Sequence, residues 1–167
     1  MSRLNLMLID HYKNPRNRGK VPDPDLSHEV INRKCGDRLM FTARRDEAYI
    51  TKILFEGSGC FYCLASASIA CDTMSGLQEA QVRQVAADTR KWLHSEEVSR
   101  AGSEKAGQDQ SEGVSKSQEL SILRDYPLIA ALGEIKQFPM RIGCADLAWK
   151  GLLEMLDSAD MNTGKNR

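Results

Sequence analysis

The chain has 167 residues, of which 41% are hydrophobic, a length and an apolar content that suit one domain with a buried core. Its 23 basic residues are balanced by 23 acidic ones, so no excess of positive charge attracts nucleic acid or an anionic membrane. No apolar stretch of the sequence approaches the roughly 20 residues that cross a bilayer. We therefore expect no nucleic-acid partner and no membrane partner.

The first residues and the cysteine content suggest the compartment. The start, MSRLNLMLIDHYKNP, lacks the charged-then-apolar order of a secretory signal, and we expect a cytoplasmic protein. The five cysteines are an odd number, and thiols in the cytosol stay reduced. Metal binding or thiol chemistry is therefore favoured for these cysteines over a framework of disulfides.

The first third of the chain is expected to contain one helix and a small sheet. Leucines spaced along residues 4–12 predict a short amphipathic helix, and the three prolines within residues 14–25 predict an irregular connection. Alternating apolar residues predict strands over residues 37–45 and 48–56, joined by a polar hairpin loop. A further strand over residues 27–32 would complete a small antiparallel sheet.

Helices are expected in much of the remaining chain. Residues 61–74 predict a helix bounded by glycines on both sides, and residues 77–94 predict a second helix. Residues 95–119 are polar with few large apolar side chains, which predicts a mobile insertion. Pro139 is expected to act as a breaker, and residues 144–156 predict a final amphipathic helix.

Three cysteines are expected at boundaries of these elements, each beside a glycine. Cys35 lies at a turn that leads into a strand, Cys60 lies at a strand-to-helix junction, and Cys144 lies near a helix start. Such boundaries can converge at one end of a small fold, and an adjacent glycine allows the close backbone approach that a crowded metal site needs. At a helix N-terminus, unpaired N–H groups also favour a thiolate over a thiol. Together with Asp37, these thiols would form a Cys₃Asp set suited to zinc or an iron-sulfur cluster.

Asp37 distinguishes this donor set from a purely structural zinc site. A carboxylate matches zinc or an iron-sulfur cluster less well than a thiolate does, so the bound metal should exchange more readily. Simpler explanations stay open, because a lone cysteine is often a small buried hydrophobe and Asp37 also suits an ordinary turn. Cys71 is expected to pack in a helix core, whereas Cys63 lies on the same helix face as Cys60.

Five short stretches of the chain occur in an order that is typical of one family. They are DHYKNPRNRG, CGD, FEGSGC followed by ASAS, MSG and RIGCADLAWKGL. Together they resemble the SufU branch of the NifU/IscU-like iron-sulfur cluster assembly proteins. The IscU branch has a histidine before the last cysteine, whereas this chain has Gly143 there and Arg141 three residues before the cysteine.

This resemblance implies a fold and a domain organisation. It implies an α+β fold of the SufE/NifU-like, IscU type, in which helices pack on a small antiparallel sheet and the metal site lies at one end. It also implies a single NifU N-terminal-like domain over residues 1–160, which contains the insertion at 95–119. Residues 161–167 are expected to form a frayed tail.

The resemblance also implies a ligand set and a reaction. Cys35, Asp37, Cys60 and Cys144 match the ligand positions of the family. The SufU branch is associated with tightly bound Zn²⁺ and with accepting persulfide sulfur from a pyridoxal-phosphate cysteine desulfurase of the SufS kind. By that analogy Cys35 is expected to be the sulfur acceptor, and Arg141 is expected to stabilise a thiolate or persulfide anion by its charge.

Two alternative functions use the same four residues. The first is a scaffold on which a labile [2Fe-2S] cluster is assembled and handed on to other iron-sulfur assembly proteins. The second is a structural zinc domain used for protein interaction, which the carboxylate ligand disfavours. The chain departs from the family pattern at Cys63, where a small or hydroxylated residue is more usual, so this thiol could compete as a ligand or act as a second thiol.

Overall fold

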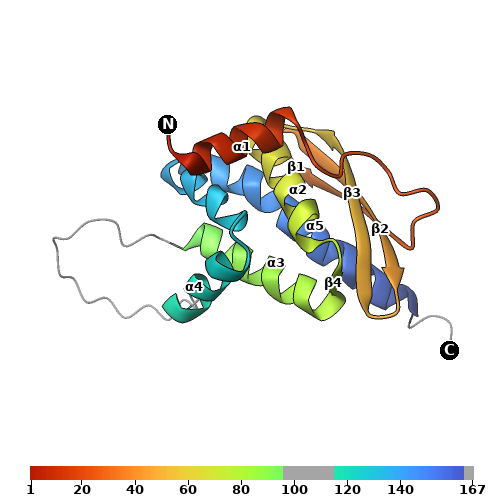
Figure 1. Cartoon of the computed structure of the whole chain (residues 1–167). Helices are drawn as coiled ribbons and strands as arrows, with labels where there is room; N and C mark the ends of the chain where they lie inside the picture. Colours follow the sequence, from red (N-terminus) through yellow and green to blue (C-terminus); the bar gives the residue numbers. More distant parts are fainter. Residues whose placement is uncertain (96–114, 164–167) are drawn as a thin grey trace.

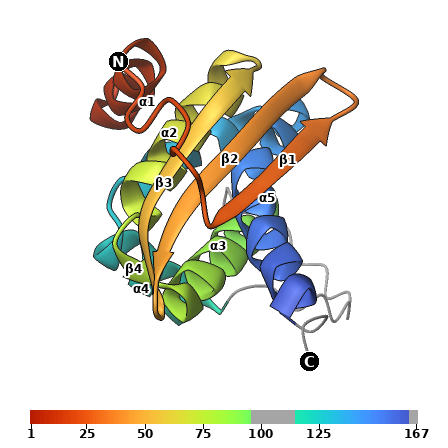
Figure 2. The same cartoon turned by 90° about the vertical axis from the view of Figure 1, so that its right-hand side faces the viewer.

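The computed structural model describes residues 1–95 and 115–163, which form a small antiparallel sheet and a set of helices. The elements in chain order are α1 (Arg3–Lys13), β1 (Leu26–Asn32), β2 (Asp37–Asp46), β3 (Tyr49–Ser58), α2 (Phe61–Met74), β4 (Leu77–Gln78), α3 (Glu79–His94), α4 (Lys116–Asp125), the 3₁₀-helix η1 (Ile129–Gln137) and α5 (Pro139–Thr163). Figure 1 shows their arrangement, and Figure 2 shows the sheet in front of α2, α3 and α5. This arrangement is the α+β fold that the sequence predicted.

The sheet has the strand order β1-β2-β3-β4, and every neighbouring pair of strands is antiparallel. Side chains alternate between the two faces of a strand, so Leu39 and Phe41 of β2 are both fully buried on the face that the helices cover. Phe41 pairs across the sheet with Phe55 of β3, which is also buried. The register of β1 with β2 pairs Asn32 with Asp37, and it therefore places the intervening turn at one end of the sheet.

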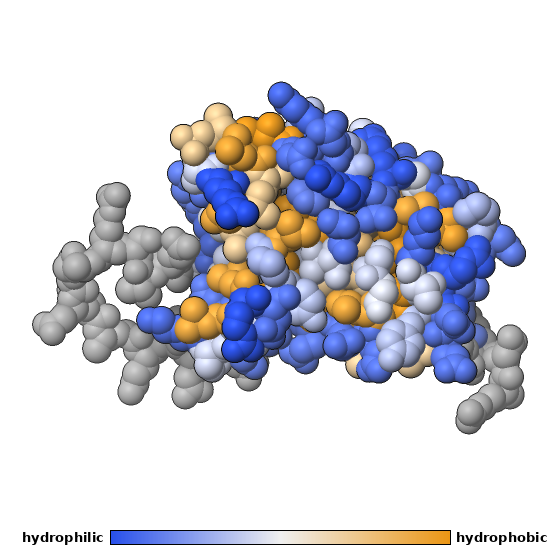
Figure 3. All heavy atoms as spheres, in the orientation of Figure 1, coloured by the Kyte–Doolittle hydropathy of each residue, from blue (hydrophilic) through white to orange (hydrophobic). Residues whose placement is uncertain are grey.

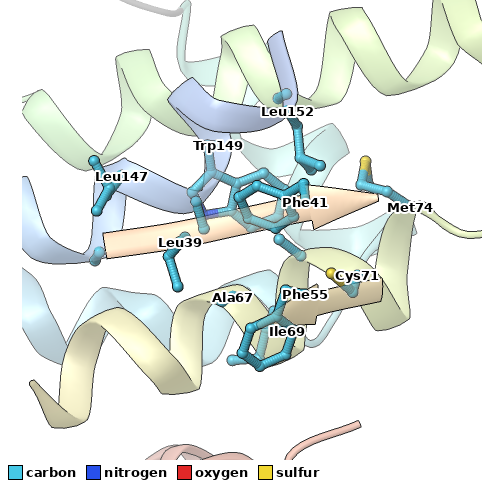
Figure 4. Packing of buried hydrophobic residues seen from close by; sticks show 14 of the residues in the cluster. Leu39, Phe41, Phe55, Ala67, Ile69, Cys71, Met74, Leu147, Trp149 and Leu152 are labelled. Atoms are coloured by element: carbon cyan, nitrogen blue, oxygen red, sulfur yellow. The ribbon is translucent and has the colours of Figure 1, made fainter. Parts of the chain in front are cut away.

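The core lies between the sheet and the two helices α2 and α5. Figure 4 shows Trp149 of α5 packed with Phe41, and Ile69 of α2 packed near Phe55. Gly151 allows α5 to approach the sheet closely, because a Cβ atom there would lie 2.7 Å from Val30 Cγ1 and 2.8 Å from Phe41 Cε2. The position of α5 against β1 and β2 is thus fixed by close packing.

The surface and the helix lengths add two observations. Figure 3 shows that the face seen in Figure 1 is largely hydrophilic, with apolar side chains gathered in separate patches. Exposed apolar residues include Leu6 of α1, Phe138 and Met140. Within the ranges that the structure describes, no helix is both long enough and apolar enough to cross a membrane.

Most of the predicted elements are present with small shifts of their ends. The helix predicted over residues 4–12 is α1, which begins after Ser2, whose hydroxyl accepts a hydrogen bond from the Asn5 N–H (3.1 Å). The three predicted strands are β1, β2 and β3, and the helix predicted over 61–74 is α2. The helix predicted over 77–94 begins later, at Glu79, because Leu77 and Gln78 pair with β3 as the short strand β4.

Three features differ from the sequence predictions. Pro139 opens α5 instead of separating it from the preceding segment, since proline fits the first position of a helix, where no N–H partner is needed. Residues 116–119, expected in a mobile insertion, form the start of α4, which Ser115 caps through a hydrogen bond from the Gln118 N–H (3.3 Å). Residues 161–163, expected to fray, continue α5. The rest of the predicted insertion and tail, 96–114 and 164–167, lies outside the described residues.

Candidate metal centre

Three predicted site residues converge at one end of the sheet. One ligand atom each of Cys35, Asp37 and Cys144 lies within 4.8 Å of the others. Cys35 belongs to the turn between β1 and β2, Asp37 is the first residue of β2, and Cys144 lies in the second turn of α5. Residues more than 100 positions apart in the chain thus meet because α5 packs across β1 and β2.

The turn that carries Cys35 is tight and places the thiol at the surface. Gly36 has φ +72°, a conformation that favours glycine, and its N–H donates to the Asn32 carbonyl (2.8 Å). The side-chain oxygen of Asn32 accepts a hydrogen bond from the Lys34 N–H (3.1 Å). Cys35 is exposed between these anchored residues, so another protein can reach its sulfur.

Asp37 provides a buried carboxylate oxygen that no group in the described part of the chain satisfies. Its side chain is 2% exposed, and its Oδ1 accepts a hydrogen bond from the backbone N–H of Cys60 (3.0 Å). Its Oδ2 is buried and has no hydrogen-bond partner among the residues that the structure describes. A buried unpaired carboxylate oxygen is destabilising unless it binds a cation or a donor. This oxygen therefore fits a metal ligand better than it fits an ordinary turn residue.

Cys144 is buried beside the exposed cysteine. Its thiol donates to Cys35 Sγ over a distance of 3.3 Å. Burial raises the pKa of the Cys144 thiol above its ordinary value, and the closeness of Cys35, Asp37 and Cys60 raises this pKa further. The predicted start of this helix, at residue 144, was too late by more than a turn, because α5 already begins at Pro139. The position of Cys144 in the helix interior explains why its side chain is fixed and inaccessible.

Arg141 faces the same cluster from the first turn of α5. A hydrogen bond with Cys144 holds the pKa of the Arg141 guanidinium above its ordinary value, and the negative charges of Cys60, Cys144 and Cys35 in their thiolate form act in the same direction. The guanidinium is exposed, so it is free to meet an anion that approaches from solvent. The structure thus places this side chain beside the thiols, and its charge-stabilising role stays a prediction.

Cys60 adjoins the cluster without joining its closest group. It is the N-cap residue of α2, as its sequence position predicted, with φ −70° and ψ 171°. Its N–H binds Asp37, and its thiol lies close enough to raise the pKa of Cys144. Among the residues that the structure describes, however, the group within 4.8 Å contains only Cys35, Asp37 and Cys144. Cys60 is half-buried beside this group, and its role as a fourth ligand stays a prediction.

Cys63 is a buried thiol near the Asp37 carboxylate. It is fully buried, three residues after Cys60 in the first turn of α2. A Cβ atom on Gly59 would lie 2.9 Å from Cys63 Sγ and 3.0 Å from Asp37 Oδ1, so glycine is required at position 59 for these side chains to come together. Burial raises the pKa of the Cys63 thiol, and the negative charges of Asp37, Cys60 and Cys35 raise it further.

Ser66 braces the two helices that carry the cysteines, a role that the sequence did not reveal. Its hydroxyl donates to the Ala145 carbonyl (2.7 Å) and accepts from Trp149 Nε1 (3.1 Å). The contact joins α2 to α5 immediately beside Cys144. The available sequence signal was a serine within an alanine-rich, apolar helix. A hydroxyl buried by such a helix needs hydrogen-bond partners.

The donor set fits a thiophilic metal. Tetrahedral zinc with Zn–S bonds of about 2.3 Å places neighbouring ligand atoms roughly 3.8 Å apart. The observed separation of 3.3 Å between Cys35 and Cys144 sulfurs, and the limit of 4.8 Å for the group, agree with that spacing. The unpaired Asp37 Oδ2 supplies an oxygen donor at the same place. These residues can bind zinc or an iron-sulfur cluster.

Comparisons with known proteins agree with this fold and donor set. The family described as the NifU-like N-terminal domain matches residues 5–115. The chain is 33% identical over 146 residues to the zinc-dependent sulfurtransferase SufU of Bacillus subtilis, which covers 87% of this chain and 84% of that protein. It is 26% identical over 149 residues to the iron-sulfur cluster assembly scaffold protein IscU of Thermotoga maritima, which covers 89% of each chain.

Solved structures share the fold at lower sequence identity. The N-terminal part of a nitrogen-fixing NifU-like protein from Brucella abortus superposes with a TM-score of 0.66 at 13% identity, over 93% of this chain and 92% of that one. A crystal structure of a hypothetical protein gives a TM-score of 0.69 at 23% identity, over 92% and 96% of the two chains. At these identities the likeness concerns the fold alone.

Proposed function

Since this chain belongs to the NifU-like N-terminal domain family, we propose that it acts in iron-sulfur cluster assembly as a zinc-containing acceptor of persulfide sulfur. The relative from Bacillus subtilis is named a zinc-dependent sulfurtransferase, and it aligns with most of this chain. The proposed donor of the sulfur is a pyridoxal-phosphate cysteine desulfurase. Relatives named as assembly scaffolds support the wider role in cluster assembly.

The observation that carries this proposal is the contrast between Cys35 and its neighbours. Cys35 is exposed on a turn, whereas Cys144 and Asp37 are buried beside it. A sulfur acceptor must reach the persulfide of a partner protein, and only an exposed thiol can do so. We therefore assign sulfur acceptance to Cys35, and metal binding to Cys35, Asp37, Cys60 and Cys144.

The transfer step is a thiolate exchange. The Cys35 thiolate attacks the outer sulfur of the persulfide on the desulfurase cysteine. A new S–S bond forms at Cys35, the S–S bond on the desulfurase breaks, and its electron pair leaves on the desulfurase cysteine as a thiolate. No external oxidant or reductant is consumed.

Zinc, when bound, keeps the ligand cysteines in the thiolate form and protects them from unwanted oxidation. Two other residues of the site have roles of their own. Asp37 gives the site a ligand that binds less tightly than a thiolate. Arg141 lies beside the Cys144 thiol with its guanidinium exposed, and we propose that it stabilises the persulfide anion on Cys35 by its charge.

Alanine production by a cysteine desulfurase tests the proposal. The assay compares the desulfurase alone, with the zinc-loaded protein and with its Cys35→Ala variant, under reducing conditions. We expect strong stimulation by the zinc-loaded protein and none by Cys35→Ala. Cys71→Ala is the matched control, because Cys71 lies in the core beside Phe55 and Met74 (Figure 4) and should leave stimulation unchanged. Full stimulation by Cys35→Ala would refute the assignment.

A scaffold for a [2Fe-2S] cluster is the second candidate, favoured by the same thiol and carboxylate donors and by the relatives named IscU. It predicts no stimulation of the desulfurase. It also predicts an iron-sulfur chromophore after anaerobic reconstitution with iron and sulfide. Under either function the thiols must stay reduced, which accords with the cytoplasmic location that we propose.

A further inference from the structure

We propose that Cys63 is a replacement metal ligand, which takes the place of Cys35 when Cys35 carries sulfur. The inference deepens the proposed function and rests on it. A sulfur acceptor that is also a metal ligand leaves the metal with three donors whenever it accepts sulfur. The described structure contains a further thiol beside those three donors.

Cys35 is the donor best placed to leave. It is exposed on the β1–β2 turn, whereas Asp37 begins a strand and Cys144 lies inside a helix. Cys60 caps α2 and is half-buried. Removing Cys35 from this set leaves two thiols and one carboxylate, all anchored in regular structure.

Cys63 is positioned to complete that remaining set. Helix geometry puts residues three apart on one face, so Cys63 faces the same side of α2 as Cys60. Its Sγ and Asp37 Oδ1 both lie within 3.0 Å of the point that a Gly59 Cβ would occupy. The glycine thus removes the side chain that would otherwise separate the Cys63 thiol from the carboxylate.

The unpaired oxygen of Asp37 is a second sign, because it shows that a cation fits at the carboxylate whose other oxygen lies near Cys63. Within residues 1–95 and 115–163, Asp37 Oδ2 is buried without a partner although Oδ1 is hydrogen-bonded. With Cys60, Cys63 and Cys144, this carboxylate makes a second Cys₃Asp set that shares three members with the first. A four-coordinate site can therefore exist before and after Cys35 departs.

The exchange of Cys35 for Cys63 conserves atoms and electrons and needs no further reactant. Cys35 leaves as the thiolate that attacks the persulfide. The S–H bond of Cys63 breaks, its sulfur binds the metal with a lone pair, and its proton passes to water. The total charge of the ligands around the metal stays the same.

Cobalt binding tests this proposal without any desulfurase. Co²⁺ replaces Zn²⁺ in such sites, and its thiolate-to-metal absorbance rises with the number of thiolate ligands. Cys35→Ala mimics the departure of Cys35, and we expect the protein to fold normally because this position is exposed. We expect Cys35→Ala to give the same absorbance per bound Co²⁺ as the unmodified protein. Cys35→Ala/Cys63→Ala should then lose about one third of it, because one of three thiolates is missing.

The control is Cys35→Ala/Cys71→Ala, which removes another buried thiol of α2 and should retain the full absorbance. If Cys35→Ala alone loses a third of the absorbance, the proposal is wrong, and this result does not depend on whether the Cys63 variant folds. A protein that keeps its absorbance in Cys35→Ala but never stimulates a desulfurase would refute sulfur acceptance and leave the ligand role of Cys63 standing.

Discussion

The buried side chain of Ser66 joins α2 to α5 at the metal site, and it gives a prediction at the scale of one residue. Ser66→Ala removes two hydrogen bonds and leaves the Trp149 N–H buried without a partner. We expect the free energy of unfolding to fall by about 1–3 kcal/mol, measured by urea denaturation of the metal-free protein. Ser158→Ala is the control, because Ser158 bonds only within its own helix and should change stability by less than about 0.5 kcal/mol.

His11 of α1 gives a second prediction at this scale, about pH. Its ring Nδ1 lies 2.8 Å from the Ser68 hydroxyl, and burial, helped by the charge of Arg16, lowers its pKa below the ordinary value of 6.5. The unfolded chain therefore takes up this proton first, and stability falls as the pH drops below 6.5 towards the lowered pKa.

The measurement is denaturation of the metal-free protein at several pH values between 7.5 and 5. His11→Gln cannot titrate in this range, so its stability should decline less over this interval than that of the unmodified protein. Equal declines in the two proteins would show that His11 titrates normally when folded. His28 and His94, which both contact carboxylates, are present in both proteins. Any effect they have on stability therefore cancels when the two declines are compared.

Two glycines in α5 give a prediction at the scale of the element. Gly151→Ala would press a methyl group against Val30 and Phe41, both of which are buried. We expect overpacking to lower the free energy of unfolding by about 1–3 kcal/mol. Gly143→Ala, in the same helix, would meet only Asn32 Nδ2 at 3.8 Å and should be neutral or stabilising by up to about 1 kcal/mol. Similar effects at both positions would argue against the close packing of α5.

The sequence predicted those elements whose patterns are local. Alternation identified β2 and β3, and an apolar run between glycines identified α2. It missed β4, because a two-residue strand has no periodicity of its own, and α4, because only Ile122 of that helix is buried. Pro139 misled the prediction because a proline can either end a helix or begin one, and the choice depends on what packs against it.

The candidate site was predictable in its members but not in its geometry. Cys35, Asp37 and Cys144 converge as expected. The burial of Cys63 beside Asp37 depends on the space above Gly59, which only the packed structure reveals. The ligand roles of these residues, and the single domain over residues 1–160, stay predictions.

Metal loading should stabilise the whole molecule, since the proposed ligands come from the sheet and from both core helices. A ligand present at 100 times its dissociation constant adds about 2.7 kcal/mol to the free energy of unfolding. For a domain of this size that increment raises Tm by roughly 5–10 °C. We expect a chelator to reverse this rise in a calorimetric scan.

Asp37→Asn is the informative variant for this measurement. The amide can still accept the Cys60 N–H, whereas it binds a metal less well than the carboxylate, and it removes the buried unpaired charge. The metal-free variant should therefore be at least as stable as the unmodified protein, and its Tm should rise less on adding zinc. An undiminished rise would remove Asp37 from the ligand set.

The pairing of Asn32 with Asp37 across the β1–β2 turn links the strand register to metal binding. Shifting one strand by a single residue turns each of its side chains to the opposite face of a sheet. Such a slip would carry Leu39 and Phe41 out of the core and, in the same movement, turn Asp37 away from Cys144. A misfolded chain with this error would be unable to retain the metal, so metal content would report whether each molecule had reached its correct strand register.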